Sequence, residues 1–389
     1  MNPSMNEDDR KQIAVELLSA GADEEYLSPE RETAPAALAA AAGPSIQFPD
    51  GLDPRPREFN EEPSPTDALP KADVVVVTWT VAEHRALADV LTPGFPPTSW
   101  YRYTRNYAQY HSKIRPGAPA DKGKRLGTYF VTEIDRKTVL CIKSELHLNQ
   151  DSIQSKTHPG TATLPVKDFF RQIIGEASPG SVLTVGTSGG TFESHGLGDV
   201  VVTRSAKFRL NDEFKNELFN GRQYNSNWKI PDDHVDDALK IMQGFSKNLI
   251  EPAFAPPTKR YKFKGKPIPP AKNTPQIHFD GRNGIPEFHP ILTTDFFEYG
   301  TSANHLDKEG IAVEMGDAVL GLVAEEMGGQ APNWAVVRNL SDPVINADLQ
   351  TSPRPINMQT HWAVWYYETY GYWTSFMGAL ATWAIIAGL

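Results

Sequence analysis

Residues 181–208 constrain the possible fold more than any other stretch of this sequence. They begin with a short β-branched run, residues 182–185, which is typical of a buried strand. Small residues follow at 186–190, where the sequence is GTSGG, and a second apolar run occupies residues 200–202. This pattern predicts a strand, a glycine turn, a short loop and a second strand. Such an arrangement brings backbone N–H groups and small hydroxyls to the carboxyl end of a sheet, where open α/β folds bind their ligands.

The glycine segment matches two known motifs only in part. Gly186, Ser188 and Gly190 have the GxSxG spacing of the nucleophile elbow of α/β-hydrolases. Asp342 and His361 then follow in the chain order of a hydrolase triad. However, an elbow must lead into a helix, and the residues after this segment have no helical period, so a serine hydrolase is disfavoured. A dinucleotide-binding fingerprint is disfavoured as well, because its G-x-G-x-x-G spacing is not present here.

A carboxylate follows the first predicted strand of the globular domain. Residues 74–77 are four valines, which predict a fully buried strand, and residues 81–91 have the apolar spacing of a helix. Glu83 falls in the first turn of that helix, where a negative charge is favourable for the helix dipole. The same position lies just beyond the carboxyl end of a strand, so Glu83 is also a candidate to face a ligand.

Further segments complete the predicted sheet and its helices. A hairpin is expected over residues 127–142 and a helix over 166–174. Residues 311–313 predict a strand that leads into a helix of small and apolar residues beginning near Gly316. Residues 334–342 predict a last strand, which ends in the sequence VVRNLSD.

In combination, these segments resemble the signatures of the purine nucleoside phosphorylase and nucleosidase superfamily. GTSGG followed by LGDVVV, then VEM before a small-residue helix, and then VVRNLSD occur in the order found in that superfamily. The resemblance covers about residues 71–389. It implies a three-layer α/β fold of the nucleoside phosphorylase type, with a central mixed twisted sheet flanked by helices.

The resemblance also implies roles for individual residues. The glutamate in the position of Glu83 is the general base for water in the related nucleosidases, and the aspartate in the position of Asp342 donates a proton to the purine N7. Other matching positions lie beside the sugar or the base in the relatives. Those candidate substrate-binding residues are Ser188, Gly189, Phe297, Glu314, Met315, Asp317 and Arg338.

The residue types suit the cleavage of a purine N-glycosidic bond. This reaction leaves an oxocarbenium-like sugar and an anionic base, so it needs a proton donor at the base and a nucleophile on the opposite face of the sugar. Asp342 as the acid requires a dry site that raises its pKa, whereas Glu83 as the base must stay ionised. The sequence contains no HExxH or comparable ligand cluster, and we expect neither a metal nor a cofactor.

Water is the expected nucleophile. The phosphorylases of the superfamily hold phosphate with arginines, one of which stands two residues before the glycine turn, and here that position is Thr184. A carboxylate at Glu83 would also repel phosphate. We therefore expect hydrolysis of a purine nucleoside or nucleotide, with adenine as the base, as in the methylthioadenosine/S-adenosylhomocysteine nucleosidases. A phosphorolytic enzyme is the second choice.

One position departs from the family pattern. In those nucleosidases a second glutamate follows the Glu-Met pair and binds the ribose diol, whereas this chain has Gly316. Either Asp317 replaces that glutamate or the sugar is held differently. The loss also suggests a nucleotide-binding sensor without turnover as an alternative. Some long bacterial relatives are antiviral effectors that remove adenine from ATP, and this chain resembles them in its extension and in the basic stretch at 259–272, whose lysines suit phosphate groups.

The outer parts of the chain are expected to be peripheral. Residues 1–70, rich in alanine, proline and glutamate, predict an extension that is partly disordered or docks on a partner, before a domain that spans 71–389. Residues 209–290 are expected to be an insertion with helices at 211–219 and 232–249. Residues 358–389 are aromatic and apolar and predict a helix that covers the sheet or a subunit interface in preference to a membrane span.

Composition limits the compartment and the partners. The formal net charge of −10 disfavours binding to nucleic acid, and the single cysteine, Cys141, cannot form a disulfide within the chain. The first residues do not have the pattern of a secretory signal, so a cytoplasmic protein is expected. The expected partners are a small-molecule nucleoside or nucleotide and further copies of the same chain.

Overall fold

The structure is a computed structural model that describes residues 43–150, 152, 158–250, 274–348 and 358–389. Residues 1–42 of the expected N-terminal extension and the basic stretch at 259–272 lie outside the described residues. Within them the chain forms a mixed sheet with helices on both sides, which confirms the expected fold class.

The described residues contain one thirteen-stranded sheet in the order β1-β4-β5-β2-β6-β12-β11-β8-β9, to which β3, β7, β10 and β13 are attached. Its strands are β1 (Arg55–Arg57), β2 (Val74–Thr78), β3 (Tyr101–Tyr103), β4 (Gly127–Ile134), β5 (Lys137–Ser144), β6 (Ser181–Gly190), β7 (Val200–Thr203), β8 (Ser205–Phe208), β9 (Gln223–Asn225), β10 (Ile277–Phe279), β11 (Ile291–Thr293), β12 (Ala312–Glu314) and β13 (Asn333–Asp342).

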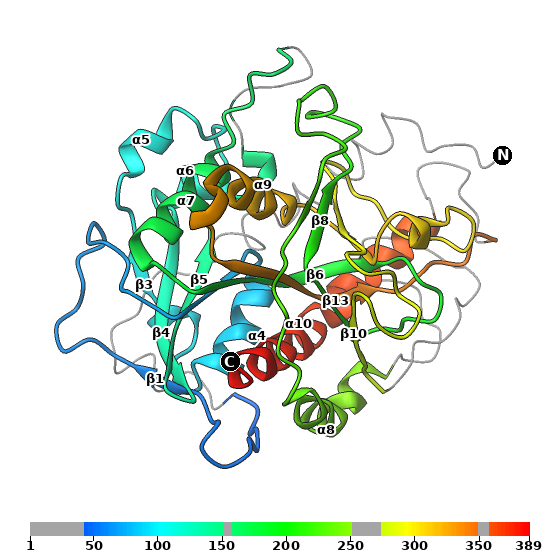
Figure 1. Ribbon diagram of the computed structural model, residues 1–389, viewed down its shortest axis with the longest axis horizontal. Coiled ribbons are helices and arrows are strands. Elements are labelled where there is room, and N and C mark those ends of the chain that lie inside the picture. The colour runs from blue at the N-terminus through cyan, green and yellow to red at the C-terminus, as the bar shows by residue number, and fades with distance from the viewer. Residues whose placement is uncertain (1–42, 151, 153–157, 251–273, 349–357) are drawn as a thin grey trace.

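β6 is the strand around which the sheet is built (Figure 1). Residues 181–184 pair in parallel with β2 and residues 181–189 with β13, while Gly189 and Gly190 pair antiparallel with β12. The predicted glycine turn is therefore wrong, because residues 186–190 continue the strand. Hydrogen bonds to neighbouring strands along this segment outweigh the weak intrinsic strand preference of glycine.

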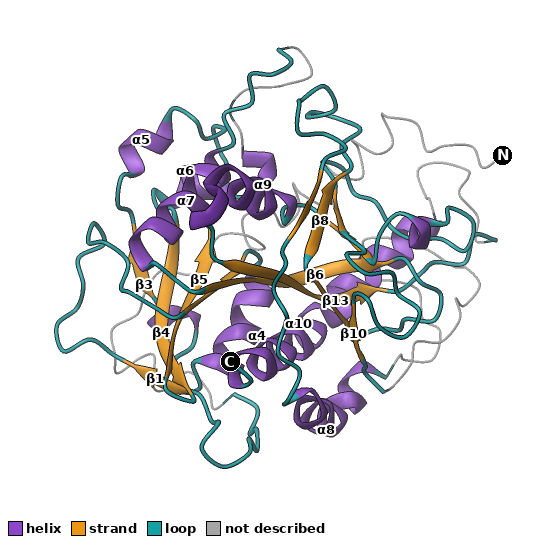
Figure 2. Cartoon of the chain, viewed as in Figure 1, coloured by secondary structure: helices purple, strands orange, loops and turns teal. Residues whose placement is uncertain are grey.

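The helices form one layer on each side of the sheet (Figure 2). They are α4 (Val81–Leu91), α5 (Tyr107–His111), α6 (Pro119–Gly123), α7 (Pro165–Ala177), α8 (Val235–Phe245), α9 (Ala318–Met327) and α10 (Met358–Ala387). Single 3-10 turns occur at Pro97–Ser99, Leu148–Gln150, Ser246–Leu249, Leu306–Lys308 and Gly328–Gln330. α7 packs with α9 on one side, and α4 packs with α10 on the other.

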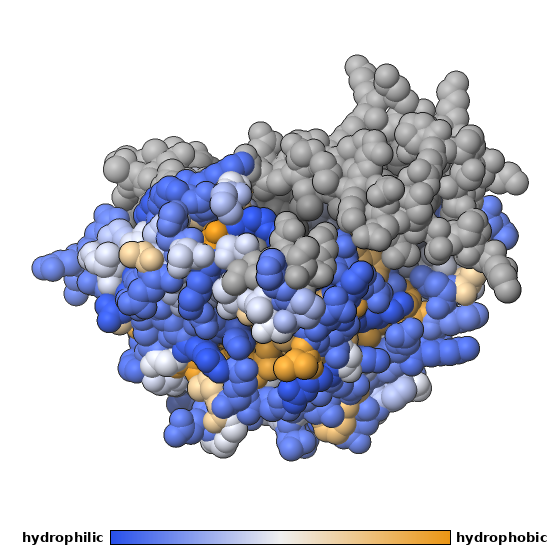
Figure 3. Space-filling model, turned by 90° about the horizontal axis from the view of Figure 1, so that it is seen from above, coloured by the Kyte–Doolittle hydropathy of each residue, from blue (hydrophilic) through white to orange (hydrophobic). Residues whose placement is uncertain are grey.

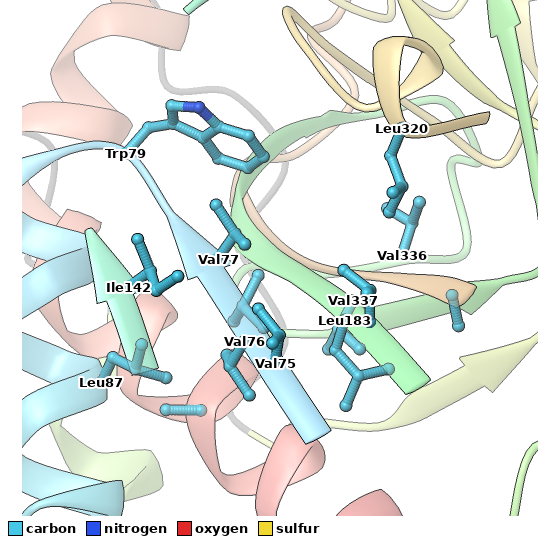
Figure 4. Close-up of a cluster of buried hydrophobic side chains, with 14 of the residues drawn as sticks. Val75, Val76, Val77, Trp79, Leu87, Ile142, Leu183, Leu320, Val336 and Val337 are labelled. Atoms are coloured by element: carbon cyan, nitrogen blue, oxygen red, sulfur yellow. The ribbon is translucent and has the colours of Figure 1, made fainter. Parts of the chain in front are cut away.

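Both layers bury the same central strands. Figure 4 shows the valines of β2 packed with Leu87 of α4 and Leu183 of β6, and it shows Leu320 of α9 directed at Val336 of β13. Trp79 lies at one end of this cluster, just after β2. The hydrophobic core therefore ends where the strands end, at the edge where the candidate site residues lie.

Part of the predicted insertion differs from expectation. Residues 211–219 are not a helix, because the carboxylate of Asp295 accepts the backbone N–H groups of Asn211, Asp212 and Phe214 and holds them in a turn. α8 and the 3-10 turn that follows it confirm the second helix, expected at 232–249. β9 and β10 belong to the same segment, so the insertion extends the main sheet.

Residues before 71 also contribute to the sheet. β1 pairs antiparallel with β4 and forms an edge. The indole Nε1 of Trp383 in α10 donates to the backbone oxygen of Leu52 at 2.8 Å. This part of the expected N-terminal extension is therefore docked on the rest of the chain, while the domain boundary at residue 71 stays a prediction.

The aromatic C-terminal segment forms α10, which packs along α4, β6 and β13. Trp362, Phe376 and Trp383 are among its fully buried side chains. Among the described residues, no helix has the length and apolar character that crossing a membrane requires. On the face seen in Figure 3 the described surface is mostly hydrophilic, with small apolar patches.

Candidate active site

Four strands bring the candidate residues to one end of β6. β2, β6 and β13 run in parallel, so the residues at their carboxyl ends lie at the same edge. Glu83 follows β2 at the start of α4, and Arg338 and Asp342 belong to β13. β12 pairs with the last residues of β6 and ends in Glu314. Residues that are far apart in the sequence therefore meet here.

Glu83 is buried and accepts five hydrogen bonds. Its Oε2 accepts from the hydroxyl of Thr78 and from the backbone N–H groups of Trp79 and Thr80, at 2.9–3.0 Å. Its Oε1 accepts from both the backbone N–H and the hydroxyl of Thr187, each at 2.8 Å. The Thr80 hydroxyl in turn accepts from the Glu83 N–H, which completes a capping box at the start of α4. Glu83 thus caps a helix and also contacts the glycine strand.

The carboxyl group of Glu83 is held in its charged form. Burial by itself raises the pKa, but the positive charge of Arg338 and the hydrogen bonds from Thr80 and Thr187 outweigh it, so the pKa is lowered from its ordinary value. Glu83 is therefore ionised at neutral pH, as a general base must be.

Arg338 lies at the centre of the charged cluster. Its Nε and Nη2 donate to the two carboxylate oxygens of Asp317 at 2.7 and 2.6 Å, and Nη2 also lies 3.3 Å from Oε2 of Glu314. Nη1 donates to the backbone oxygen of Thr187 at 3.2 Å. The guanidinium is 4.9 Å from the centroid of the Trp79 ring, within the range of a cation–π interaction. These contacts fix its orientation.

Gly186 allows Arg338 and Glu83 to approach the same point of β6. A Cβ atom at this position would collide with Nη1 of Arg338 and would lie only 2.6 Å from Oε1 of Glu83. The first glycine of the GTSGG segment is therefore required by the close approach of two charged side chains, and not by a turn.

Glu314 and Asp317 are occupied by protein donors. Glu314 accepts from the Thr293 hydroxyl, from the backbone N–H groups of Gly316 and Asp317, and from Arg338. Burial and the charge of Asp317 raise the pKa of Glu314 to about 8, although Arg338 and the hydrogen bonds act in the opposite direction. Asp317 is fully buried and stands at the N-cap position of α9.

Asp342 ends β13 next to an irregularity in its pairing with β6. Its side chain is buried, and burial raises its pKa to about 7, while a hydrogen bond from the Ser341 hydroxyl to Oδ1 at 2.9 Å acts in the opposite direction. A Cβ atom on Gly189 would lie 2.8 Å from Oδ2, so glycine is needed at this second contact as well. The carboxyl group is in the dry surroundings that a general acid requires.

The remaining predicted residues lie around this end of β6. The backbone oxygen of Glu298, the residue after Phe297, is 3.6 Å from the Cβ position of Gly189, beside which Asp342 also lies. Phe297 is half-buried and its ring centroid is 5.9 Å from that of Tyr299. Met315 is also half-buried, directly after β12.

Ser188 is not the nucleophile of an elbow. It lies within β6, where its hydroxyl donates to the backbone oxygen of Asn339 at 3.2 Å, and a loop leading to β7 follows the strand. The helix that would aim the serine is absent from this described part of the chain, so the serine hydrolase alternative is wrong.

Three residues near the site were not assigned from the sequence. Thr187 contacts Glu83, Trp79 lies beneath Arg338, and His147 lies edge-on to Trp79 at a centroid distance of 5.9 Å. The sequence offered a feature that could have identified two of them: Thr187 stands within the glycine segment, and Trp79 stands directly after a buried strand. Among the described residues no group of three or more His, Cys, Asp or Glu side chains is arranged to hold a metal ion.

The fold and site define an α/β protein in which two buried carboxyl groups with opposite pKa shifts contact one glycine-rich strand. No family model matches the sequence, and no curated protein matches it. Similar solved structures include the 5′-methylthioadenosine/S-adenosylhomocysteine nucleosidase from Neisseria meningitidis, with 12% identity over 81% of this chain and 99% of that chain and a TM-score of 0.44.

Two similar structures are from Helicobacter pylori. The 5′-methylthioadenosine/S-adenosylhomocysteine nucleosidase has 10% identity over 82% of this chain and 99% of that one, with a TM-score of 0.43. The futalosine hydrolase has 10% identity over 81% and 97%, with a TM-score of 0.42. The proposed function depends on the residues of the site.

Proposed function

We propose that this protein hydrolyses the N-glycosidic bond of a purine nucleoside or nucleotide and releases the free base, with adenine as the base. The observation that supports this proposal is the pair of buried carboxyl groups that contact β6. Glu83 contacts Thr187, and Asp342 lies beside Gly189. These two points are about 7 Å apart, since a strand rises about 3.3 Å per residue. The two groups thus contact the strand at separate points, as an acid and a base that flank one glycosidic bond must.

The proposed reaction uses the two groups in opposite protonation states. As the C1′–N9 bond breaks, its electron pair moves to the base, and the neutral carboxyl of Asp342 gives its proton to N7. Water attacks C1′ from the opposite face of the sugar while Glu83 accepts its proton. The products are the free purine and the sugar. A pKa of about 7 leaves Asp342 protonated in a large fraction of molecules at neutral pH.

The hydrogen bonds of Glu83 leave a route for water. Two of its five donors are threonine hydroxyls, which can rotate, whereas backbone N–H groups cannot. Rotation of the Thr187 hydroxyl toward a bound ligand would free a lone pair of Oε1. We propose that the attacking water binds to that lone pair.

The surroundings of Arg338 favour water over phosphate. A phosphate ion needs cations that are free to bind it, but the guanidinium already donates to Asp317, Glu314 and Thr187. The ionised carboxylate of Glu83 adds repulsion. We therefore propose hydrolysis, with a sugar near Glu314, Met315 and Asp317 and a base that stacks on Phe297. Oligomeric state, cytoplasmic location and a role in antiviral defence stay predictions.

Chromatographic measurement of free adenine tests the proposal. Adenosine, methylthioadenosine, AMP and ATP are incubated with the protein, with and without phosphate. We expect release of adenine from at least one of them at a rate that does not depend on phosphate. Asp342→Asn should reduce that rate roughly 10²- to 10⁴-fold, the usual contribution of general acid catalysis.

Two outcomes would contradict the hydrolase. Absence of base release from every purine tested removes the proposal, and tight binding of a nucleotide without product would favour a sensor. Release that requires phosphate would indicate a phosphorylase. Ser99→Ala is a suitable control variant, because Ser99 is buried in a 3-10 turn outside the site and should leave the rate unchanged.

A further inference from the structure

Asn339 follows Arg338 on β13, and the two side chains lie on opposite faces of the sheet. Arg338 binds Asp317 at the start of α9, whereas a Cβ atom on Gly378 of α10 would lie 2.8 Å from a terminal amide atom of Asn339. α9 and α10 cover different sides of the sheet (Figure 1). Asn339 is fully buried, and a buried amide needs hydrogen-bond partners of its own.

The amide group of Asn339 has partners on two elements, and they determine its orientation. Its Nδ2 donates to the backbone oxygen of Gly186 in β6 at 2.8 Å. Its Oδ1 accepts from the Thr374 hydroxyl at 3.0 Å and from the Ser375 N–H at 3.2 Å, both in α10. The reverse orientation would place oxygen against the Gly186 oxygen and nitrogen against the Ser375 N–H, so only this one satisfies both ends.

The peptide group that accepts from Asn339 also binds the candidate base. The oxygen of Gly186 and the N–H of Thr187 belong to one planar peptide, in which they point in opposite directions. The N–H donates to Oε1 of Glu83 at 2.8 Å, while the oxygen accepts from Asn339. Hydrogen bonds in such a chain polarise one another, each by roughly 10–30%. The amide of Asn339 therefore fixes the Thr187 N–H and makes it a stronger donor to Glu83.

We propose that Asn339 is a positioning residue for the reaction: it holds the Gly186–Thr187 peptide so that the carboxylate of Glu83 keeps one orientation. This inference rests on the proposed function for the role of Glu83 as the base. The peptide N–H cannot rotate, so it can hold Oε1 while the Thr187 hydroxyl turns to a ligand. Residues 374–375 of α10 then have an indirect part in the site, because they orient the amide of Asn339.

Other charged and titratable groups act on Glu83 as well. Electrostatic interactions link it to Arg338 of β13, to Lys143 of β5 and to His147, which follows β5. A substitution at Asn339 leaves all three groups in place. Weaker donation by the Thr187 N–H would destabilise the charged carboxylate, so the pKa of Glu83 should rise in such a variant. The titration of Glu83 therefore reports on the peptide.

The test compares pH profiles of base release in the wild type and Asn339→Ala. The values of kcat and KM are measured from about pH 3 to pH 9 with the adenine compound that is cleaved fastest in the chromatographic assay. We expect the acid limb, which follows Glu83, to move to higher pH by roughly half a unit, while the alkaline limb, which follows Asp342, stays in place. At neutral pH kcat should fall roughly tenfold with little change in KM.

Two variants in α10 form a matched pair. Thr374→Val is nearly isosteric and removes the hydroxyl that donates to Asn339. The same hydroxyl lies 3.2 Å from the backbone oxygen of Gly371, so its loss should shift the acid limb in the same direction by a smaller amount. Among the described residues the Ser375 hydroxyl has no hydrogen-bond partner, and Ser375→Ala should leave the profile unchanged. If Asn339→Ala does not fold, the comparison of this pair decides.

The outcomes separate this inference from the proposed function. If base is released and Asn339→Ala lowers activity equally at every pH, the role of Asn339 is structural and the inference is overturned. If no purine is cleaved, the carboxyl group of Glu83 is titrated by NMR with isotope-labelled glutamate, and Glu83→Gln identifies its signal. A higher pKa of Glu83 in Asn339→Ala would then support the contact chain while the hydrolase fails. An unchanged pKa would overturn it.

Discussion

At the scale of single residues, the local surroundings shift the pKa values of Glu83 and Asp342 in opposite directions. Both side chains are buried, and burial alone would raise both pKa values. Glu83 is close to Arg338 and accepts five hydrogen bonds, so it remains charged. At Asp342 the hydrogen bond from the Ser341 hydroxyl opposes the effect of burial but does not outweigh it, so the pKa is raised to about 7. A difference in donors, and not in burial, decides the two roles.

The Ser341 hydroxyl should control the pH range of activity. It donates to the carboxylate of Asp342 and thereby stabilises the charged form. Ser341→Ala removes that bond, so the pKa of Asp342 should rise further, by roughly half a pH unit or more. Because the protonated form is the active one, the loss of activity at high pH should move to higher pH. A kcat profile between pH 5 and 9 checks this, and a shift to lower pH would contradict the role of Asp342.

Asp342 should also make stability depend on pH. Its folded pKa is about 7 and therefore higher than its ordinary unfolded value, so its contribution to stability is complete below about pH 4 and is lost as pH rises through about 7. Urea unfolding at pH 4 and pH 8 measures this effect. The free energy of unfolding of Asp342→Asn, relative to that of the wild type, should increase by roughly 2 to 4 kcal/mol from pH 4 to pH 8. An equal difference at both pH values would mean that the buried carboxyl does not have this pKa.

The two functions of Glu83 can be separated by a matched pair of variants. Thr80→Ala removes the hydroxyl that caps α4 but keeps the carboxylate, so it should cost about 1 kcal/mol of stability and little activity. Glu83→Gln keeps the shape but loses the charge, and base release should fall at least a hundredfold. Denaturant unfolding and the adenine assay on both variants check this. If Thr80→Ala and Glu83→Gln lose the same amount of activity, Glu83 acts only as a helix cap and not as a base.

At the scale of elements, β6 connects the fold to the site. It pairs with three strands of the sheet, and it also contacts both candidate acids. Its glycines lie in extended chain, where their lack of a side chain makes room for Glu83, Arg338 and Asp342. A sequence pattern that predicts a turn from glycine alone therefore fails here. The close approach of charged side chains is the reason for the small residues.

Gly186→Ala should disrupt the site more than the fold elsewhere. Its Cβ would collide with Arg338 and lie within 2.6 Å of Glu83. We therefore expect the free energy of unfolding to fall by roughly 1 to 3 kcal/mol and most of the activity to be lost. Gly175→Ala is the control, since a Cβ there meets no atom within 4 Å and the residue lies in α7. The free energy of unfolding of that variant should rise by about 0.5 to 1 kcal/mol, because alanine has a higher helix propensity than glycine. Thermal melting and the adenine assay measure both, and tolerance of Gly186→Ala would contradict the packing around β6.

At the scale of the whole molecule, α10 links parts of the chain that are remote in sequence. It covers β6 and β13 and contacts α4 and α8. Through Trp383 it also forms a hydrogen bond with the backbone of Leu52. The ring centroids of Phe48 and Trp383 are 4.8 Å apart. The N-terminal and C-terminal parts of the described chain therefore stabilise each other across the sheet.

Trp383→Phe should weaken this link without touching the site. The variant keeps an aromatic ring but loses the 2.8 Å hydrogen bond to Leu52, at a cost of about 1 kcal/mol. Limited proteolysis should cut the segment at 43–54 faster than in the wild type, while base release stays unchanged. If the cleavage rate is unaffected, the segment is held by its other contacts.

Patterns that depend on neighbours in sequence were sufficient for much of the architecture. The valines of β2, the helical spacing of α4 and the hairpin of β4 and β5 were all predicted within a few residues, because hydrophobic period and burial coincide there. The candidate acids at 83 and 342 could also be named, since each follows or ends a buried strand.

Only the tertiary structure decided how those groups are used. It binds Glu83 to Thr187, commits Asp317 to Arg338, keeps the GTSGG segment in a strand and brings His147 to Gly316. No local pattern contains this information, because each contact joins residues separated by tens to hundreds of positions. Hydrogen bonding and desolvation between such residues, and not their own types, determine which carboxyl group is charged.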